Sequence, residues 1–343
     1  MEVVASWPAG SPLSGVADWA RRAETLGFDV MHVPETIHDP FTVAALALDS
    51  TESLVVRTSM VVAFARSPMV TAYTAWDLAR FSGGRFQLGL ASQVRGNIVG
   101  RFSAEWSEPV ARLRQYVEAV RTIFASFQTG EELRYEGEHY TFDRLQPYFN
   151  PGPLGTESPA IWTGGVNPRM CELAGEVSDG FVCHPTNSHP DVLTSSIMPA
   201  IEAGRERAGR TDGGPHVIAG PQPIMAATEA ELKTVRDGRR HELAFLYSTP
   251  AYRQQLEMFG LGELGEVLSQ MAKRDEWDEL EQHMTDEVIG QLVPQATYDA
   301  LPETLEEWYA GLVDGIVLTI PDDAESSSFE AIVERCKAIA PRS

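Results

Sequence analysis

Polar residues that could take part in catalysis lie in the segment 35–40 (ETIHDP). A carboxylate and an imidazole three residues apart, Glu35 and His38, can exchange protons with a reacting group near neutral pH. The structural alternative is a solvated loop in which Asp39 caps a helix that begins at Pro40. We expect the capping role for Asp39. For Glu35 and His38 the residue types alone leave both interpretations open.

A second candidate site lies in the segment 163–169 (TGGVNPR). An Asn followed by Pro, as at Asn167, is typical of a helix start, where free N–H groups and the helix dipole suit a phosphate. The alternative is a tight turn that requires the glycines Gly164 and Gly165. The segment is not a Walker A loop, because no GK[ST] follows it. We predict a phosphate-binding turn.

The remaining candidate residues give weaker indications of ligand binding. The small residues at the end of segment 85–91, followed by Ser92, would let a flat ligand approach the backbone, although barrel packing explains them equally well. His184 could contact a ligand, whereas Cys183 is expected in the core. The three cysteines form no CxxC pattern, and no HExxH or Gly-x-Ser-x-Gly motif occurs. The sequence therefore predicts no metal site and no hydrolytic triad.

The elements that position these residues alternate between short β-rich stretches and longer amphipathic ones. Strands are predicted at 1–7, 28–34, 54–64, 85–91, 160–163, 180–184, 216–227 and 315–320. Helices are predicted at 13–26, 41–50, 68–81, 109–127, 168–176, 191–208 and 329–339. This alternation is typical of βαβ units with a parallel sheet. Eight such units without a break in composition predict one (β/α)₈ TIM barrel domain over residues 1–343.

Two interruptions are expected in the barrel. An irregular insertion at about 129–157 follows the fourth strand and its helix, and extra helices precede the last strand. The first strand–helix turn, 8–12, lacks GxGxxG, so a Rossmann domain is not supported. Catalytic residues of TIM barrels lie at the carboxyl ends of the strands, which is where segments 35–40 and 163–169 fall.

The composition narrows the possible partners. The chain has 343 residues and a formal net charge of −22, which disfavours nucleic acid and anionic membranes as partners. The first residues do not resemble a signal peptide, and no stretch of 18 apolar residues occurs. We expect a cytoplasmic protein whose acidity serves solubility.

Together these segments resemble the luciferase-like flavin and deazaflavin oxidoreductases, a (β/α)₈-barrel family. The resemblance covers nearly the whole chain. It is carried by RTSMVVAFARSPMVTA at 57–72, SGGRFQLGLASQ at 82–93, RYEGEHYTF at 134–142 and WTGGVNPRMCELAGEVSDGF at 162–181. The branch that it resembles most uses the deazaflavin coenzyme F420.

The resemblance also implies roles for individual residues. It implies a non-prolyl cis peptide at Ser59–Met60 behind the cofactor ring, and an acidic residue after the second strand at Glu35. The implied cofactor-binding residues are Thr36, Ser59, Met60, Ser92, Asn97, Gly164, Gly165, Val166 and Asn167. Thr36 departs from the His of many relatives. Val94 stands where the family's sugar-phosphate dehydrogenases carry Glu, so glucose 6-phosphate is a poor candidate substrate.

The activity implied by the resemblance is hydride transfer between F420 and a small organic substrate. His38 or Glu35 would then be the catalytic proton donor or acceptor. The alternatives are an FMN-dependent monooxygenase that works with a separate flavin reductase, and a barrel that binds cofactor without catalysis. A homodimer is expected from the resemblance alone.

Overall fold

Parallel strands joined by helices form the centre of the fold. The computed structural model describes residues 1–322 and 326–342. The barrel strands are β1 (Glu2–Ser6), β2 (Val30–Val33), β3 (Val55–Thr58), β5 (Phe86–Ala91), β8 (Ile161–Gly165), β9 (Gly180–Cys183), β10 (His216–Ala219) and β13 (Gly315–Leu318). The strand order is β3-β2-β1-β13-β10-β9-β8-β5, and β3 also pairs with β5, which closes the sheet. The predicted (β/α)₈ barrel is confirmed.

The chain divides into two compact units. The N-terminal unit comprises Ala5–Val182 and Ala200–His216. The C-terminal unit comprises Met1–Val4, Cys183–Pro199 and Val217–Ser343. A single domain over the whole chain stays a prediction.

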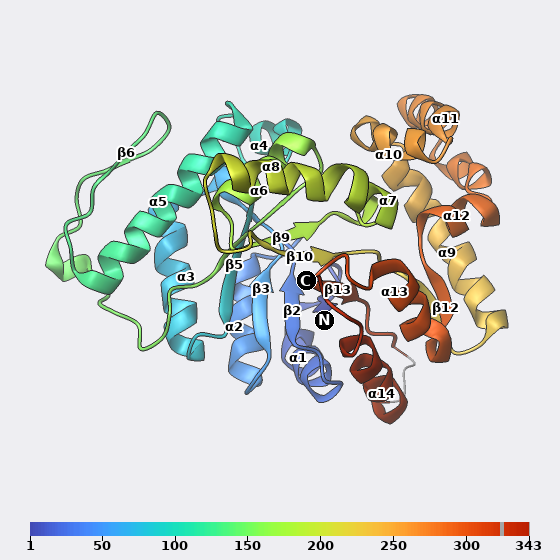
Figure 1. The fold of residues 1–343 in the computed structure, drawn as a ribbon, viewed down its shortest axis with the longest axis horizontal. Coiled ribbons are helices and arrows are strands. Elements are labelled where there is room, and N and C mark those ends of the chain that lie inside the picture. The colour runs from blue at the N-terminus through green and yellow to red at the C-terminus, as the bar shows by residue number, and fades with distance from the viewer. Residues whose placement is uncertain (323–325, 343) are drawn as a thin grey trace. The chain divides into compact units, whose positions relative to one another are not determined.

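The N-terminal unit holds the first half of the barrel. β2 pairs with β3, β3 with β5, and β5 with β8, all in parallel. The helices are α1 (Val16–Thr25), α2 (Pro40–Ser50), α3 (Pro68–Ser82), α5 (Pro109–Thr129) and α6 (Pro168–Val177), and Figure 1 shows α1, α2 and α3 beside β2, β3 and β5. As predicted, α2 begins at a proline and Asp39 caps it: the Asp39 carboxylate accepts from Thr42 N at 2.9 Å.

The third strand was predicted at 54–64, and this length is wrong. β3 ends at Thr58, and the chain resumes as β4 (Val61–Val62), which pairs with β5. The predicted cis peptide at Ser59–Met60 is confirmed. The Ser59 amide donates to Val33 O at 2.7 Å, and the Val62 amide donates to a side chain, so the ladder is interrupted here. We call residues 59–62 the β3–β4 bulge.

The insertion at 129–157 is less irregular than predicted. It contains an antiparallel hairpin of β6 (Tyr135–Glu136) and β7 (Thr141–Phe142), whose strands are too short to show an alternating pattern in the sequence. The segment that follows is tied to α3: Trp76 Nε1 donates to Gly152 O at 3.0 Å, and Tyr73 Oη donates to Phe149 O at 2.6 Å. A short helix that the sequence did not predict, α4 (Arg95–Gly100), follows β5.

In the C-terminal unit the predicted strand 216–227 is also wrong. β10 pairs with β13 and ends at Ala219. β11 (Ile224–Ala226) pairs instead with β12 (Gln295–Thr297), in a separate two-stranded sheet. The segment 220–223 carries two prolines, which lack an N–H group, and a residue with positive φ, so it cannot continue a ladder.

The extra helices predicted before the last strand are present. They are α9 (Glu229–Tyr247), α10 (Arg253–Met258), α11 (Gly262–Lys273) and α12 (Asp286–Leu292), which gather into one group in Figure 1. Their buried core includes Leu243, Tyr247, Leu256, Leu268 and Ile289. α13 (Leu301–Tyr309) and α14 (Ser326–Lys337) flank β13 in the sequence. Within the described residues, every helix is too short or too polar to span a membrane.

All three cysteines are free thiols in the interior. Cys171 lies in α6 of the N-terminal unit, while Cys183 and Cys336 belong to the C-terminal unit. Burial raises the pKa of the Cys171 and Cys336 thiols to about 12. These thiols are therefore protonated and unreactive in the folded protein.

Candidate active site

Glu35 lies directly after β2 and is tied to the β3–β4 bulge. Its side chain is 5% exposed. Its carboxylate accepts from Val62 N at 2.7 Å and from Arg66 Nη1 at 2.8 and 2.9 Å. Arg66 also donates to Asp39 at 3.0 Å, so one guanidinium joins the bulge to the start of α2. This geometry favours a positioning function for Glu35, because both of its oxygens already accept hydrogen bonds.

His38 keeps one ring nitrogen free. Its Nε2 atom lies 3.1 Å from the carbonyl oxygen of Ser11, which can only accept, so Nε2 carries the proton. Nδ1 is then the basic nitrogen, and it makes no hydrogen bond with the described residues. Of the two predicted catalytic groups, His38 is therefore the one that is able to accept a proton.

Thr36 anchors the loop between these residues. Its hydroxyl donates to Ala9 O at 3.4 Å, and its carbonyl accepts from Arg101, which follows α4. The short helix α4 is thereby linked to the loop that carries His38. Thr36 itself has little freedom to contact a cofactor through its carbonyl.

The β3–β4 bulge packs against the next strands of the barrel. The Thr58 hydroxyl bonds both backbone groups of Gly89, at 2.8 and 3.1 Å. A Cβ atom on Gly89 would lie 1.9 Å from Thr58 O, so only glycine allows this close approach. A Cβ atom on Gly164 would lie 3.3 Å from the Met60 side chain. The fold therefore brings Met60 and Gly164, which are far apart in the sequence, next to each other.

Ser92 and Asn97 follow β5. The Ser92 hydroxyl donates to the neighbouring Gln93 O at 3.2 Å. Asn97 lies in α4 and is half-buried, and its side-chain amide makes no hydrogen bond with any described residue. A half-buried amide without a partner is well suited to bind a polar ligand.

The predicted phosphate turn ends β8. Gly164 and Gly165 are its last residues, and Val166 and Asn167 lead into α6. The Asn167 side chain accepts from Met170 N at 3.0 Å and caps the helix. The start of α6 therefore has the form that binds phosphate groups in other proteins. Together with the free groups of His38 and Asn97, the residues present fit a ring cofactor that carries a phosphate.

In the C-terminal unit, His184 lies directly after β9. Its Nδ1 accepts from Thr186 N at 3.4 Å, so Nε2 carries the proton, and the Tyr252 hydroxyl lies 3.3 Å from Nε2. The two rings are stacked, with centroids 4.9 Å apart. Burial lowers the pKa of His184 to about 4. The sequence predicted His184 from its place after a strand. Tyr252 lies in a short turn between α9 and α10, and no pattern in the sequence indicated it.

The low pKa of His184 makes stability depend on pH. In the unfolded chain the pKa of His184 is near 6.5. Between pH 6.5 and 4 the imidazole is therefore protonated in the unfolded chain but stays neutral in the folded protein. The free energy of unfolding should therefore be highest above pH 6.5 and fall as the pH is lowered, by roughly 3 kcal/mol from this group at pH 4. Urea unfolding across this range measures the slope.

His184→Gln should reduce that slope, since glutamine does not titrate; the part that remains comes from groups such as His32 and His189, whose pKa burial also lowers. His241→Gln, which removes an exposed imidazole of α9, is the matched control and should leave the slope in place. An unchanged slope in His184→Gln would show that other groups govern the acid sensitivity.

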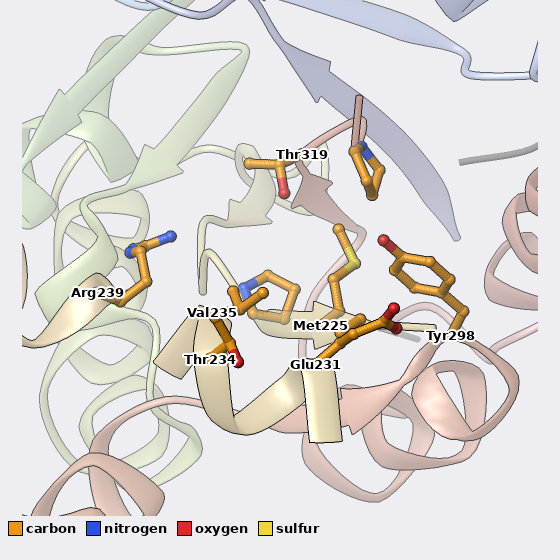
Figure 2. A pocket seen from close by; sticks show the side chains of 10 residues that line it. Met225, Glu231, Thr234, Val235, Arg239, Tyr298 and Thr319 are labelled. Atoms are coloured by element: carbon orange, nitrogen blue, oxygen red, sulfur yellow. The ribbon is translucent and has the colours of Figure 1, made fainter. Parts of the chain in front are cut away.

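A pocket of about 380 Å³ lies within the C-terminal unit (Figure 2). It is lined by Pro223, Met225, Ala226, Glu231, Thr234, Val235, Arg239, Tyr298, Thr319 and Pro321. Figure 2 shows Arg239 and Tyr298 on opposite sides, with Met225 and Val235 between them. Arg239 already pairs with Glu242 at 2.9 Å, and Glu231 bonds the Thr228 hydroxyl at 3.0 Å. The two charged residues of this pocket therefore already have partners in α9 or at its start.

The fold is a (β/α)₈ barrel in which a glycine-containing turn joins β8 to the capped start of α6. Residues 2–315 match the luciferase-like monooxygenase family, and the chain belongs to that family. It is 37% identical over 305 residues to an uncharacterized protein of Mycobacterium tuberculosis, covering 89% of each chain. It is 29% identical over 210 residues to the F420-dependent glucose-6-phosphate dehydrogenase of Nakamurella multipartita, covering 57% of this chain and 59% of the relative.

Solved structures agree on the fold. The coenzyme F420-dependent tetrahydromethanopterin reductase from Methanopyrus kandleri superposes with a TM-score of 0.79 at 17% identity, covering 98% of both chains. Other structures with this fold include monooxygenases, one of them in complex with FMN. Members of the family with an assigned activity are oxidoreductases and monooxygenases, and their cofactors are deazaflavins or flavins.

Proposed function

We propose that this protein is an F420-dependent oxidoreductase that transfers a hydride between the deazaflavin and a small organic substrate. The observation that carries the proposal is the likeness in sequence, over more than half of the chain, to enzymes named for F420. The FMN enzyme with this fold is similar in structure only, at 17% identity. F420 is therefore the better candidate.

The residues that would hold the cofactor come from several strands of the N-terminal unit. The turn of Gly164, Gly165, Val166 and Asn167 would bind its phosphate, and the Asn97 amide and Ser92 would contact its polar edge. Ser59 and Met60 would support the ring from the β3–β4 bulge. When bound, the cofactor supplies or accepts the hydride.

His38 is the proposed proton acceptor for substrate oxidation. During substrate oxidation, the proton of the substrate's hydroxyl or amine group would pass to the free Nδ1 of His38. The hydride that a bound cofactor would accept carries two electrons and one proton from the carbon, and the second proton would reside on the imidazole. In the reverse direction the same nitrogen returns the proton. Glu35 acts through the bulge, as a positioning residue.

Absorbance titration of the protein with F420 and, separately, with FMN tests the cofactor assignment. We expect F420 to saturate at one equivalent and FMN to bind at least tenfold more weakly. Asn97→Ala should weaken F420 binding about tenfold, the loss of one hydrogen bond to a charged or polar ligand group. Tight FMN binding without F420 binding would make the protein a flavin monooxygenase instead, and binding of neither would indicate a barrel without this activity.

His38→Ala separates binding from chemistry. We expect F420 binding to remain within about twofold of the unsubstituted protein and turnover to fall by a factor of 10² to 10⁴, on the order of what general acid–base catalysis contributes. Glu35→Gln is the companion variant. If both variants keep full turnover with cofactor bound, neither residue transfers the proton.

A further inference from the structure

We propose a divalent transition-metal site formed by Glu108, Glu138 and His139. The sequence predicts no metal site here, because the two segments are about thirty residues apart and show no ligand motif. The structure brings them together: one carboxylate oxygen of each glutamate and one ring nitrogen of His139 all lie within 4.8 Å of one another. All three residues belong to the N-terminal unit.

The ring nitrogen of His139 is the strongest sign of a missing ligand. Its Nε2 atom is buried and has no hydrogen-bond partner in the described structure, and the whole side chain is only 12% exposed. Buried polar atoms are nearly always bonded to protein, water or an ion. The nearest acidic atom, Glu108 Oε2, is 3.7 Å away. That separation is too long for a hydrogen bond but close to the roughly 3.4 Å between two ligands of one tetrahedral zinc ion.

The two carboxylates lack a basic partner. No lysine or arginine of the described residues forms an ion pair with Glu108 or Glu138. The nearby Arg112 is engaged elsewhere, with the Tyr140 hydroxyl at 3.0 Å and the carbonyl of Glu105 at 2.6 Å. A dication would balance the two negative charges, and it leaves His139 neutral, as a metal ligand must be.

The backbone that carries the ligands is fixed against α5. The His139 amide donates to the Gln115 side chain at 2.7 Å, and the Glu108 carbonyl accepts from Arg112 N at 2.9 Å. Only the exposed glutamate side chains have to move to close the site. The metal would connect the turn between β6 and β7 to the start of α5.

The donor set selects the ion. Mg²⁺ and Ca²⁺ prefer sites made of oxygen alone, whereas an imidazole nitrogen favours Zn²⁺, Co²⁺ and similar ions. Three protein ligands leave one position of a tetrahedral zinc ion for water. We therefore infer a Zn²⁺ site that serves to hold the hairpin in place, independent of the hydride-transfer site.

Zn²⁺ titration of chelator-treated full-length protein tests the proposal, with Co²⁺ absorbance as a report of coordination geometry. We expect one equivalent of tight binding, a tetrahedral Co²⁺ spectrum, and a rise in Tm on adding Zn²⁺. His139→Gln and Glu138→Gln should each weaken Zn²⁺ binding at least about tenfold. Glu136→Gln removes an exposed glutamate from the same hairpin and should change affinity less than twofold.

Two results would overturn the site. One is equal Zn²⁺ affinity in His139→Gln and Glu136→Gln, which would mean weak binding to an acidic surface. The other is no binding by the unsubstituted protein, which would make the cluster a contact between His139 and two surface glutamates without an ion. The metal-free Tm of each variant shows whether it has folded. F420 titration of the same variants should be unchanged, which separates this proposal from the proposed function.

Discussion

Gly89→Ala is expected to destabilise the protein by about 3 kcal/mol or more, at the upper end of what overpacking costs. The new Cβ atom would lie 1.9 Å from Thr58 O and 2.7 Å from Met60 Sδ. The first contact is with backbone, so β3 and β5 must separate or the chain must bend. Urea unfolding measures the loss of unfolding free energy, and the m-values of the two proteins should be compared to check that the unfolding transition is the same.

The damage should extend to the candidate site, because Met60 belongs to the β3–β4 bulge. A folded fraction of Gly89→Ala should therefore bind cofactor more weakly than the unsubstituted protein. Gly96→Ala is the matched control. Gly96 lies in α4, and a Cβ atom there meets nothing within 4 Å, so alanine should be neutral or stabilise by up to about 1 kcal/mol. If the two variants were equally stable, the close packing of β5 against the β3–β4 bulge would not contribute to stability as proposed.

Glu35→Leu should cost roughly 3–5 kcal/mol of unfolding free energy, the range found when one partner of a buried ion pair is removed. It leaves the Val62 amide without an acceptor and the largely buried Arg66 guanidinium without its main partner. Glu35→Gln keeps an acceptor for Val62 and should cost less. Thermal and urea unfolding of both variants show which substitution destabilises the protein more.

A surface ion pair provides the comparison for Glu35. Asp18 and Arg21 lie 2.5 Å apart, with side chains 85% and 53% exposed. Asp18→Asn should change the unfolding free energy by at most about 1 kcal/mol. If Glu35→Leu costs no more than Asp18→Asn, the carboxylate does not hold the bulge, and a direct catalytic role for Glu35 becomes the better explanation of its position.

The barrel was predictable because its strands and helices differ in period and because prolines and caps mark the helix starts. The ends of elements were less predictable. The segment 54–64 was predicted as one strand, yet β3 ends at Thr58, and the amide of Val62 donates to the Glu35 carboxylate instead of to a neighbouring strand. The predicted strand 216–227 has apolar residues on both sides of 220–223, yet 220–223 cannot pair, and β11 pairs with β12, about seventy residues later in the chain. The interruption at Val62 depends on a distant contact that no local pattern encodes, whereas Pro221 and Pro223 were a local signal of the second interruption.

The positions of the candidate site residues could be predicted from the sequence, but their hydrogen bonds could not. Barrel geometry places segments 35–40 and 163–169 at strand ends, and the resemblance to the family indicated the individual residues. That Glu35 is bound by Arg66 while His38 keeps a free nitrogen depends on distances across β2 and β4. Tyr252 and the cluster of Glu108, Glu138 and His139 are assembled from distant segments, so neither had a signal in the sequence.

The buried cysteines can report local or global unfolding of the protein. A thiol reagent meets no accessible sulfur in the native chain, so labelling records only molecules in which a buried cysteine has become exposed. Cys171 lies in one compact unit, and Cys183 and Cys336 lie in the other. Labelling rates resolved by residue therefore distinguish a molecule that opens as a whole from one whose two units open separately, without any added probe or substitution.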